Sequence, residues 1–531
     1  MSGMGDPQIG EQVLRYISGA RWFAGKGRQV RLRSLTPLPW LTEVSDFFRP
    51  AAPPAVRFEI AEVTYPASED PDPTAPVAAE SDEDTHDSAL AGAPEMDSQI
   101  QAWPTEYYQL AVSYRPAPQA DLHHAEIGRF DDPDLGPVIA YDAPQDPQAC
   151  GVILSALLGG RRLRSPDREV RFTTTSASGL SSDLEPRLFT GQQSNTSVML
   201  GDTAILKLFR RLELGHNLDI EVHAALNAAG IEDVAELFGW VEGSWISGGR
   251  QLDADLAMVS EKLAGAVDGW DLALDSLRTE NASTEDSTGS GFSAEAEALG
   301  RALAEIHHAL RTAFPTTKVL GTRTAMIMMD RLREAAEIAP ALRPHIPGLL
   351  HCFDDLGAET LNIQRVHGDF HLGQTLHTPT GWKIIDFEGE PAKTIAERRT
   401  PDTVWRDIAG MLRSFDYAAA SVPGPDSVAW AADCRTAFLG GYAGGELATT
   451  DASMLRAYEA DKAIYEVAYE TRNRPDWVDI PLRAVAALAS GNRDSGSDSP
   501  PALADSNQVP LGNASPPKEH SELVSPNREQ E

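Results

Sequence analysis

The stretch that decides the fold is residues 365–374, RVHGDFHLGQ, followed by residues 382–388, WKIIDFE. Asp369 stands five residues before the carboxamide of Gln374, and a second carboxylate, Asp386, follows a short apolar segment typical of a strand. Phosphoryl transfer uses such a grouping, because one carboxylate orients an acceptor hydroxyl and takes its proton, while a carboxamide and another carboxylate hold magnesium on the nucleotide phosphates. The stretch therefore predicts a phosphoryl-transfer site.

Protein kinases have a related arrangement, in which an Asp is followed five residues later by an Asn and then by an Asp-Phe-Gly triplet. In this chain Gln374 replaces the Asn, and Glu388 replaces the Gly. The pattern indicates a kinase-like active site in a protein that is not a protein kinase.

Two histidines, His367 and His371, flank Asp369 and raise the question of a metal site. Gly368 favours a turn over a helix, and no further His or Cys follows at metal-ligand spacing, so zinc is disfavoured. We expect His367 to fix the catalytic loop by hydrogen bonds. We also expect Asp407, in a predicted helix over residues 403–415, to accept hydrogen bonds from the backbone of that loop.

Length, charge and cysteine content restrict the class of protein. The chain has 531 residues, enough for about three domains. Its formal net charge of -34 disfavours nucleic acid and anionic membranes as partners, and residues 66–102 hold ten acidic residues but no Lys or Arg. Three widely spaced cysteines predict neither disulfides nor a zinc site. Without a predicted membrane span or leader peptide, we expect a cytoplasmic protein.

Patterns along the chain suggest a division into domains. A short amphipathic helix over residues 8–20 precedes alternating strands at 30–35, 56–60 and 107–114, and strong helical patterns dominate after residue 263. The predicted parts are a cap domain (1–130) with a disordered acidic insert (66–102), an intermediate region with the nucleotide-binding lobe (131–262), a helical lobe with the catalytic and sugar sites (263–490), and a disordered tail (491–531).

The nucleotide side of the site is predicted from a hairpin over residues 197–209. Lys207 lies in its second strand, and Glu221 follows fourteen residues later on a predicted helix, as in the ion pair that anchors phosphates in kinases. A lysine at a sheet edge could equally extend its ammonium group to solvent. Upstream, Ser194, Asn195 and Thr196 either cover the phosphates or form an ordinary polar connection.

An apolar strand over residues 256–263 runs into a polar joint, as at the hinge between two lobes, where backbone groups bind adenine. Ser260 and Leu263 are the residues assigned to this hinge. Near the start of the chain, the cluster RWFAGKGR at residues 21–28 is either a turn with an aromatic anchor or an anion contact.

The acceptor side is predicted from a helix over residues 454–471. Spacing of three and four residues places one polar set on a single face, while Ala460, Ile464 and Val467 face the core. Tyrosines beside mixed charges suit a sugar, although surface ion pairs would give the same pattern. The polar set consists of Tyr458, Asp461, Lys462, Tyr465, Glu466 and Tyr469.

The runs HGDFHLGQTL, IIDFEGEPAK, WRDIAGMLRSFDYA and AYEADKAIYEVAYETRNRPDWVDIPL, together with RWFAGKGR, closely resemble actinobacterial maltokinases over residues 8–490, outside the acidic insert at 66–102 and a second polar insert at 280–291. The resemblance implies an α+β, bilobal fold like that of protein kinases and aminoglycoside phosphotransferases, with an N-terminal cap and a mostly helical C-terminal lobe. It implies ATP-dependent phosphorylation of maltose to maltose 1-phosphate, which feeds α-glucan synthesis from trehalose. Trehalose synthase is a partner suggested by that pathway.

Transferred to matching positions, the resemblance makes Asp369 the catalytic base, and Gln374 and Asp386 the Mg²⁺ ligands. Lys207 becomes the phosphate-binding lysine, with Glu221 as its partner. The predicted substrate residues are His371, Glu388, Trp405, Arg406, Tyr458, Asp461, Lys462 and Glu466.

Other functions remain open at this stage. A glucosamine kinase of the same fold could pair Asp461 and Glu466 with an amine, although Lys462 would repel it. An antibiotic-inactivating aminoglycoside phosphotransferase would accept a polycation. A kinase-like module that only binds its ligand would be expected to lack Lys207, Asp369 or Asp386, and all three are present.

Overall fold

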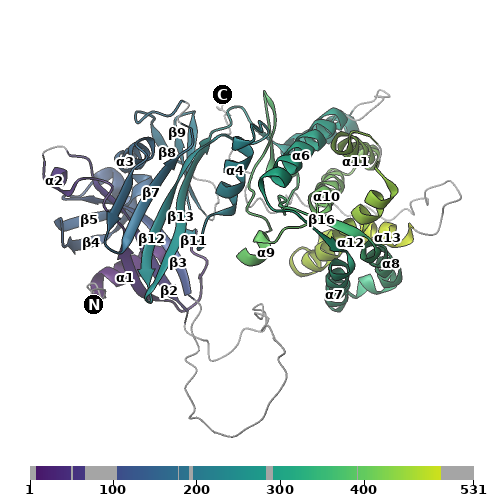
Figure 1. Cartoon of the computed structure of the whole chain (residues 1–531), viewed down its shortest axis with the longest axis horizontal. Coiled ribbons are helices and arrows are strands. Elements are labelled where there is room, and N and C mark those ends of the chain that lie inside the picture. Colours follow the sequence, from purple (N-terminus) through teal and green to yellow (C-terminus); the bar gives the residue numbers. More distant parts are fainter. Residues whose placement is uncertain are drawn as a thin grey trace, which may run out of the picture.

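The computed structural model describes residues 7–49, 52–65, 105–176, 179–189, 195–282, 291–390, 393–445 and 447–491. Within them the chain forms a strand-rich N-terminal half and a helix-rich C-terminal half, with α4 on the side of the first half that faces the second (Figure 1). The predicted acidic insert, the tail from residue 492 and Ser194 lie outside the described residues.

The first sheet has the strand order β1-β2-β3-β5-β4, and β11 pairs with β3 as an additional strand. Helix α1 packs against β1 and β4. The predicted domain boundary after residue 130 falls inside β4, and the sheet continues to Asp142. The elements are α1 (Pro7–Gly19), β1 (Arg31–Pro37), α2 (Val44–Phe47), β2 (Ala55–Thr64), β3 (Thr105–Arg115), η1 (Ala120–Ala125), β4 (Glu126–Asp132), β5 (Gly136–Asp142), η2 (Ala143–Gln145) and β11 (Arg211–Leu212).

A second sheet, with the order β6-β7-β12-β13-β10-β9-β8, lies between the first sheet and the helical half (Figure 1). The predicted hairpin is confirmed: β9 and β10 are antiparallel, and Lys207 lies opposite Ser197 and Met258. The elements are α3 (Pro147–Leu158), β6 (Arg162–Ser165), β7 (Arg168–Thr174), β8 (Pro186–Leu188), β9 (Thr196–Leu200), β10 (Ala204–Leu208), α4 (Leu218–Ala228), β12 (Leu237–Ser247) and β13 (Arg250–Glu261).

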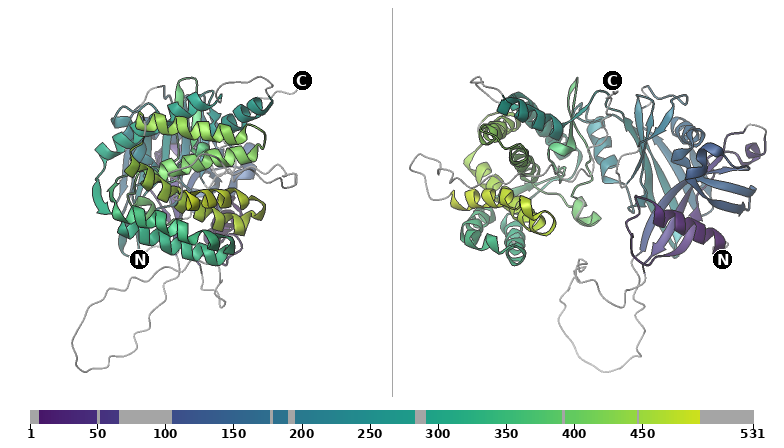
Figure 2. Two further views of the ribbon diagram at one scale, coloured as in Figure 1. Left: turned by 90° about the vertical axis from the view of Figure 1, so that its right-hand side faces the viewer. Right: turned by 180° about the vertical axis from the view of Figure 1, so that it is seen from behind.

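The C-terminal half is a group of roughly parallel helices (Figure 2) around one large apolar core. Ala460, Ile464 and Val467 are fully buried, which confirms the predicted core face of that helix. The elements are β14 (Val267–Asp268), α5 (Gly269–Ala282), α6 (Ser293–Ala313), β15 (Thr317–Leu320), α7 (Thr322–Ile338), η3 (Pro340–His345), α8 (Ile346–Ala358), β16 (Thr360–Ile363), η4 (Leu372–Gln374), β17 (Thr375–Thr378), β18 (Gly381–Ile384), α9 (Ile395–Arg399), α10 (Trp405–Ser421), α11 (Ser427–Ala443), α12 (Thr449–Asn473), η5 (Pro475–Trp477) and α13 (Asp479–Ser490).

These features confirm the predicted α+β, bilobal architecture with an additional N-terminal domain. The three cysteines are buried, and none of them forms a disulfide among the described residues. Among the described residues, no helix combines the length and the apolar character needed to cross a membrane.

Helices α6 and α11 cross closely enough that backbone approaches backbone, which gives a test of the packing. A Cβ added at Gly441 would collide with the carbonyl oxygen of Glu297, whereas one at Gly440 would meet nothing within 4 Å. Gly441→Ala should therefore lower the free energy of unfolding by about 1–3 kcal/mol. Gly440→Ala, the matched control, should leave it unchanged or raise it by up to about 1 kcal/mol, because Ala favours helix. Urea unfolding measures both, and equal midpoints for the two variants would contradict this packing.

Candidate active site

The catalytic loop is fixed by one buried carboxylate. Asp407, in the first turn of α10, accepts hydrogen bonds from the backbone N–H groups of His367 and Gly368, each at 2.8 Å. Its Oδ2 also lies 2.9 Å from Nε2 of His307. Burial raises the pKa of Asp407. The hydrogen bond and charge of His307, with the loop N–H groups, lower this pKa by more than burial raises it, so it lies below its ordinary value. The predicted structural role of Asp407 is confirmed.

His367 connects the catalytic loop to the segment that carries Asp386. Its Nε2 lies 2.9 Å from the carbonyl oxygen of Ile385, and its Nδ1 accepts the backbone N–H of Asp369 at 3.3 Å. Gly368 has a φ of 89°, a left-handed conformation that glycine adopts readily. The prediction that His367 fixes the loop by hydrogen bonds is confirmed.

Asp369 lies beside a cation from another helix. Nζ of Lys462, on α12, is 3.6 Å from Oδ1 of Asp369, and Nε2 of His371 is 3.9 Å from Oδ2. Burial raises the pKa of Asp369, but Lys462, His371 and His367 together hold it below its ordinary value. Burial lowers the pKa of Lys462, but Asp369 and Glu390 raise it overall. At neutral pH the pair is therefore an ionised carboxylate and an ammonium ion.

A cavity opens in front of Asp369, and four polar residues of α12 line it as the spacing predicted. Helix α7 and the segment after Asp386 also contribute to its lining. The lining residues are Arg331, Gly368, Asp369, Phe370, Glu390, Lys393, Glu397, Arg406, Gly410, Tyr458, Asp461, Lys462 and Tyr465.

The charges of this cavity are largely paired with one another. Nη1 of Arg331 lies 2.5 Å from Oδ2 of Asp461, and Nζ of Lys393 lies 3.0 Å from Glu390. Arg406 pairs with Asp402. The lining of the cavity holds four cationic and four acidic side chains, so their formal charges cancel. This is a polar lining with little net charge.

Four predicted substrate residues are not among those that line this cavity: His371, Glu388, Trp405 and Glu466. Trp405 is 8% exposed and belongs to the apolar core of the helical half. Glu466 turns toward α10, where its Oε2 lies 2.8 Å from Nη2 of Arg413. Spacing along α12 placed Glu466 on the same broad face as Lys462, but that face is wide enough to contact two different neighbours.

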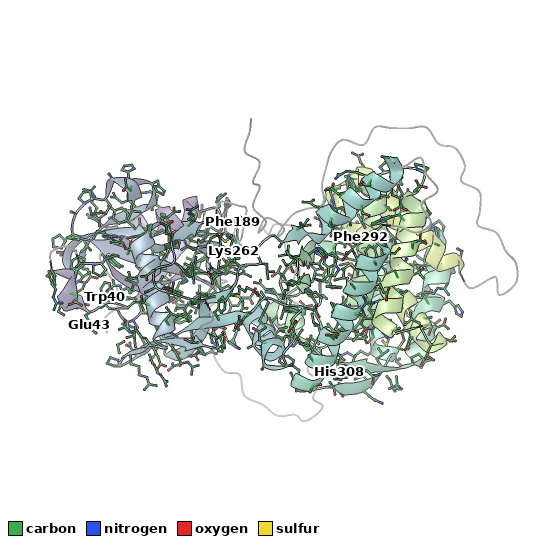
Figure 3. The ribbon with its side chains drawn as sticks, turned by 90° about the horizontal axis from the view of Figure 1, so that it is seen from above. Trp40, Glu43, Phe189, Lys262, Phe292 and His308 are labelled. Atoms are coloured by element: carbon green, nitrogen blue, oxygen red, sulfur yellow. The ribbon has the colours of Figure 1, made fainter. Side chains whose placement is uncertain are left out.

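A second cavity lies at the joint between the two halves, where Figure 3 shows Lys262 on the side of the first half that faces the second. The predicted hinge residues Ser260 and Leu263 line it. Its other lining residues are Asn195, Ser197, Ile205, Lys207, Asp219, His223, Ala235, Met258, Glu261, Lys262, Leu376, Ile385 and Asp386.

Lys207 projects into this cavity, but its partners differ from the predicted one. Its Nζ lies 2.8 Å from Oε1 of Glu388 and 3.4 Å from Oδ2 of Asp219. Burial lowers the pKa of Lys207, but Glu388, Asp219 and Asp386 together raise it well above its ordinary value. Lys207 is therefore fully charged.

The pairing of Lys207 with Glu221 was wrong. Glu221 instead lies 3.3 Å from Arg365 and 3.9 Å from Arg399. Both acids are on α4, but successive helical residues rotate by about 100°, so positions 219 and 221 point in nearly opposite directions. Glu388, predicted as a substrate residue, lies beside Lys207 and not in the lining of the cavity in front of Asp369.

Two of the predicted phosphate-covering residues are described. Asn195 lines the cavity at the joint, while the hydroxyl of Thr196 accepts a hydrogen bond from Nε of Arg210 at 2.7 Å. Thr196 does not line that cavity, and its role in covering the phosphates stays a prediction.

The predicted metal ligands lie next to each other in the structure. The carbonyl oxygen of Gln374 accepts the backbone N–H of Ile385 at 3.1 Å, which places Gln374 beside Asp386. Its side-chain Oε1 is buried and has no hydrogen-bond partner among the described residues. Carboxylates of Asp219, Asp386 and Glu388 gather within 4.8 Å of one another. These oxygen donors fit a hard divalent cation such as Mg²⁺.

Asp386 has a φ of 66°, a left-handed conformation rare for a residue other than glycine. Backbone strain of this kind is found at functional sites, where the surrounding structure maintains it. This observation independently supports a functional role for the residue.

Several residues of the two cavities were not predicted. Asp219 is the second residue of α4. The sequence shows the N-cap of this helix, Asn217, but does not show in which direction the Asp219 side chain points. Arg331 lies 130 positions before Asp461, and no sequence pattern connects the two. Glu390 and Lys393 follow the DFE triplet closely and could have been considered on that ground.

Comparison with known proteins agrees with this geometry. Residues 16–146 match the model of the maltokinase N-terminal cap domain, and residues 186–447 match that of the phosphotransferase enzyme family. A glucosamine kinase from Mycolicibacterium smegmatis is 28% identical over 327 residues, which cover 57% of this chain and 79% of the relative. One from Streptacidiphilus jiangxiensis is 29% identical over 314 residues, 54% of this chain and 70% of the relative.

Among solved structures, a glucosamine kinase in complex with glucosamine, ADP and inorganic phosphate superimposes with a TM-score of 0.58 at 19% identity, over 90% of this chain and 98% of that one. At this identity the likeness shows the fold. The two family matches and the shared fold lead to one conclusion: the chain is a maltokinase-like protein of the aminoglycoside phosphotransferase fold.

Proposed function

We propose that this protein is an ATP-dependent sugar kinase that transfers a phosphoryl group to maltose and forms maltose 1-phosphate. The observation that carries the proposal is the cavity in front of Asp369, whose polar lining has paired charges and contains tyrosines. A neutral sugar needs many donors and acceptors but no opposing net charge. The match of residues 16–146 to a maltokinase cap domain supports maltose as the sugar.

The cavity at the joint is assigned to ATP. Lys207 binds the phosphates as a fully charged ammonium group, and the hinge at Ser260 and Leu263 receives the adenine. Among the described residues, Asn195 and Thr196 are the candidates for covering the phosphates. The ammonium group contacts Glu388 at 2.8 Å and Asp219 at 3.4 Å, which leaves one of its three N–H donors for a phosphate oxygen.

Gln374 and Asp386 would hold Mg²⁺ through the carboxamide and carboxylate oxygens. Bound there, the ion would neutralise charge on the nucleotide phosphates during transfer. The buried Oε1 of Gln374, without a protein partner among the described residues, is available for this role. Asp219 and Glu388 add negative charge close by, which favours a cation at this position.

Asp369 acts as the base. It accepts the proton of the sugar hydroxyl while that oxygen forms a bond to the γ-phosphorus and the bond from the γ-phosphorus to the ADP oxygen breaks. Lys462 keeps Asp369 ionised and also faces the acceptor cavity, where it can donate a hydrogen bond to a sugar oxygen. Tyr465, in the same lining, offers an aromatic face to the sugar ring.

The alternative acceptor is an aminosugar such as glucosamine, the substrate class named in the relatives. One observation favours it: Oδ1 of Asp461 is buried and lacks a hydrogen-bond partner among the described residues. However, Oδ2 of that carboxylate already binds Arg331 at 2.5 Å, and Lys462 stands one residue away on the same helix. A hydroxyl can donate to Oδ1 without facing repulsion from these cations, whereas an ammonium group cannot. The paired charges therefore favour the neutral sugar.

A panel of acceptors tests this proposal. Purified protein with ATP and Mg²⁺ should consume ATP with maltose at a kcat/KM at least about ten-fold above that with glucosamine, glucose or kanamycin, a difference of about 1.4 kcal/mol. Mass spectrometry should identify a monophosphorylated disaccharide. Asp369→Asn, which lacks the base, should lower the turnover by about 100-fold or more. Preference for an amine-bearing acceptor would overturn the choice of maltose, and full turnover by Asp369→Asn would overturn the assignment of the base.

The partner of Lys207 gives a second prediction. Asp219→Asn removes a carboxylate that positions the ammonium group, so the dissociation constant for Mg-ADP should rise about ten-fold, as expected for the loss of one charge-assisted hydrogen bond. Glu221→Gln is the matched control from the same helix and should bind Mg-ADP as the wild type does. Isothermal titration measures both, and the opposite ranking would restore Glu221 as the partner.

A further inference from the structure

Helix α4 packs into both halves of the molecule. It lies on the side of the first half that faces the second (Figure 1). Ile220 is buried in the apolar core of the strand-rich half, whereas Val222 and Leu226 are buried in the core of the helical half. Because protein interiors are closely packed, a shift of α4 relative to one half would disturb its packing in the other. The contacts of this helix therefore set how the two halves are aligned.

Two acidic side chains of α4 connect Lys207 with the helical half. Asp219 lines the cavity at the joint, and its carboxylate contacts Lys207 at 3.4 Å. Glu221 points away from that cavity. Its Oε2 lies 3.3 Å from Nη2 of Arg365 and 3.9 Å from Nη1 of Arg399. One turn of helix thus joins the ammonium group on the nucleotide side to two cations of the helical half.

The first of these cations, Arg365, introduces the catalytic loop. It stands four residues before Asp369. Its side chain is 14% exposed, and its guanidinium carbon lies 5.2 Å from the ring centroid of Phe314. Its Nη1 donates to the carbonyl oxygen of Arg399 at 3.3 Å. These contacts hold the guanidinium group in place, so a carboxylate that pairs with it has a defined position relative to Asp369.

The second cation, Arg399, is the last residue of α9 and reaches the start of α4. Its Nη2 donates to the carbonyl oxygen of His216, just before α4 begins. The preceding residue, Arg398, pairs with the carboxylate of Glu213, and its Nη1 donates to the carbonyl oxygen of Glu388 at 3.1 Å. Helix α9 therefore ties the start of α4 to the segment that follows β18.

The carboxylate of Glu221 offsets the repulsion between the two arginines. Burial lowers the pKa of Arg365, Glu221 raises it and Arg399 lowers it, so this pKa lies below its ordinary value. With a neutral glutamine at position 221, the two guanidinium groups would repel each other and α4 would lose its charged contact with both. The contact between α4 and the helical half thus depends on this one charge.

We propose that Glu221, Arg365 and Arg399, here called the α4 joint, align the nucleotide side of the site with the catalytic loop. The inference rests on the proposed function, in which Lys207 binds ATP and Asp369 takes the proton of the acceptor. None of the three residues lines either cavity, so they are positioning residues. Transfer requires the acceptor oxygen to stand close to the γ-phosphorus and in line with the bond that breaks, which depends on the alignment of the two halves. The joint therefore contributes to turnover and not to the affinity for either substrate.

Turnover separates this role from nucleotide binding. Glu221→Gln keeps the size of the side chain but removes its charge, so kcat should fall about ten-fold, measured with the acceptor of the panel that gives the highest turnover. The dissociation constant for Mg-ADP and the KM for the acceptor should stay within about two-fold of the wild type, because an interaction that acts only in the transition state changes kcat alone. A Mg-ADP binding stoichiometry equal to that of the wild type shows that the loss does not come from unfolded protein.

A double-variant cycle tests whether the two sides of the joint act as one unit. Arg365→Gln should lower kcat at least as much as Glu221→Gln, because it also removes the hydrogen bond to the carbonyl oxygen of Arg399. The double variant should be no slower than Arg365→Gln alone, within about two-fold, because the interaction that Glu221→Gln removes is already lost. Losses that multiply in the double variant would overturn the joint.

The matched control is the same substitution in an ion pair that lies within the first half. Glu62→Gln, on β2, loses the pair with Nη1 of Arg33 on β1, 3.0 Å long, and should leave kcat at the wild-type value. Wild-type kcat in Glu221→Gln, an equal loss in Glu62→Gln, or weaker Mg-ADP binding in Glu221→Gln would overturn the joint alone. A wild-type protein that transfers phosphate from ATP to none of the acceptors would overturn the proposed function together with the joint.

Discussion

The contact between Asp369 and Lys462 is the interaction on which the site depends. Burial alone raises the pKa of a carboxylate and lowers the pKa of an ammonium group. Each group therefore helps the other to stay charged. The two come from different parts of the helical half, the catalytic loop and α12. Asp407 holds the loop through two backbone N–H groups, and the apolar face of α12 holds Lys462 against it. The fold of the helical half thus places both charges.

The charged residues around Lys207 form a second group, with a different arrangement. On the nucleotide side, Lys207 meets the carboxylates of Asp219 and Glu388, which gather with Asp386 near the carboxamide of Gln374. Three acids close together are unfavourable without cations, so the arrangement suits a site that receives a metal ion and an anionic nucleotide. On the acceptor side, acids and bases are matched within the protein. This contrast is the physical basis for assigning one cavity to Mg-ATP and the other to a neutral sugar.

Local motifs allowed much of this to be predicted from the sequence. The order of Asp369, Gln374 and Asp386, the hairpin with Lys207, the hinge and the polar face of α12 all depend on short-range spacing, and the structure places them accordingly. Predictions failed where they depended on the direction in which a side chain points. Glu221 and Asp219 are two residues apart on one helix, and only packing decides which faces Lys207. Glu466 and Trp405 turned inward to partners on α10 and in the core, and Arg331 meets Asp461 across 130 positions.

The most direct test of the account is the pH dependence of kcat for the wild type and Lys462→Met. A base must be ionised, so turnover falls as the pH falls through the pKa of Asp369. Because Lys462 lowers that pKa below its ordinary value, the wild-type acid limb should lie below about pH 4. In Lys462→Met the effect of burial on the pKa of Asp369 is opposed only by the two histidines, so the midpoint should move upward, whatever the absolute rate. Lys393→Met, which removes a cation of the same cavity that pairs with Glu390, should leave the midpoint in place. An acid limb that is the same in Lys462→Met and the wild type would contradict the account.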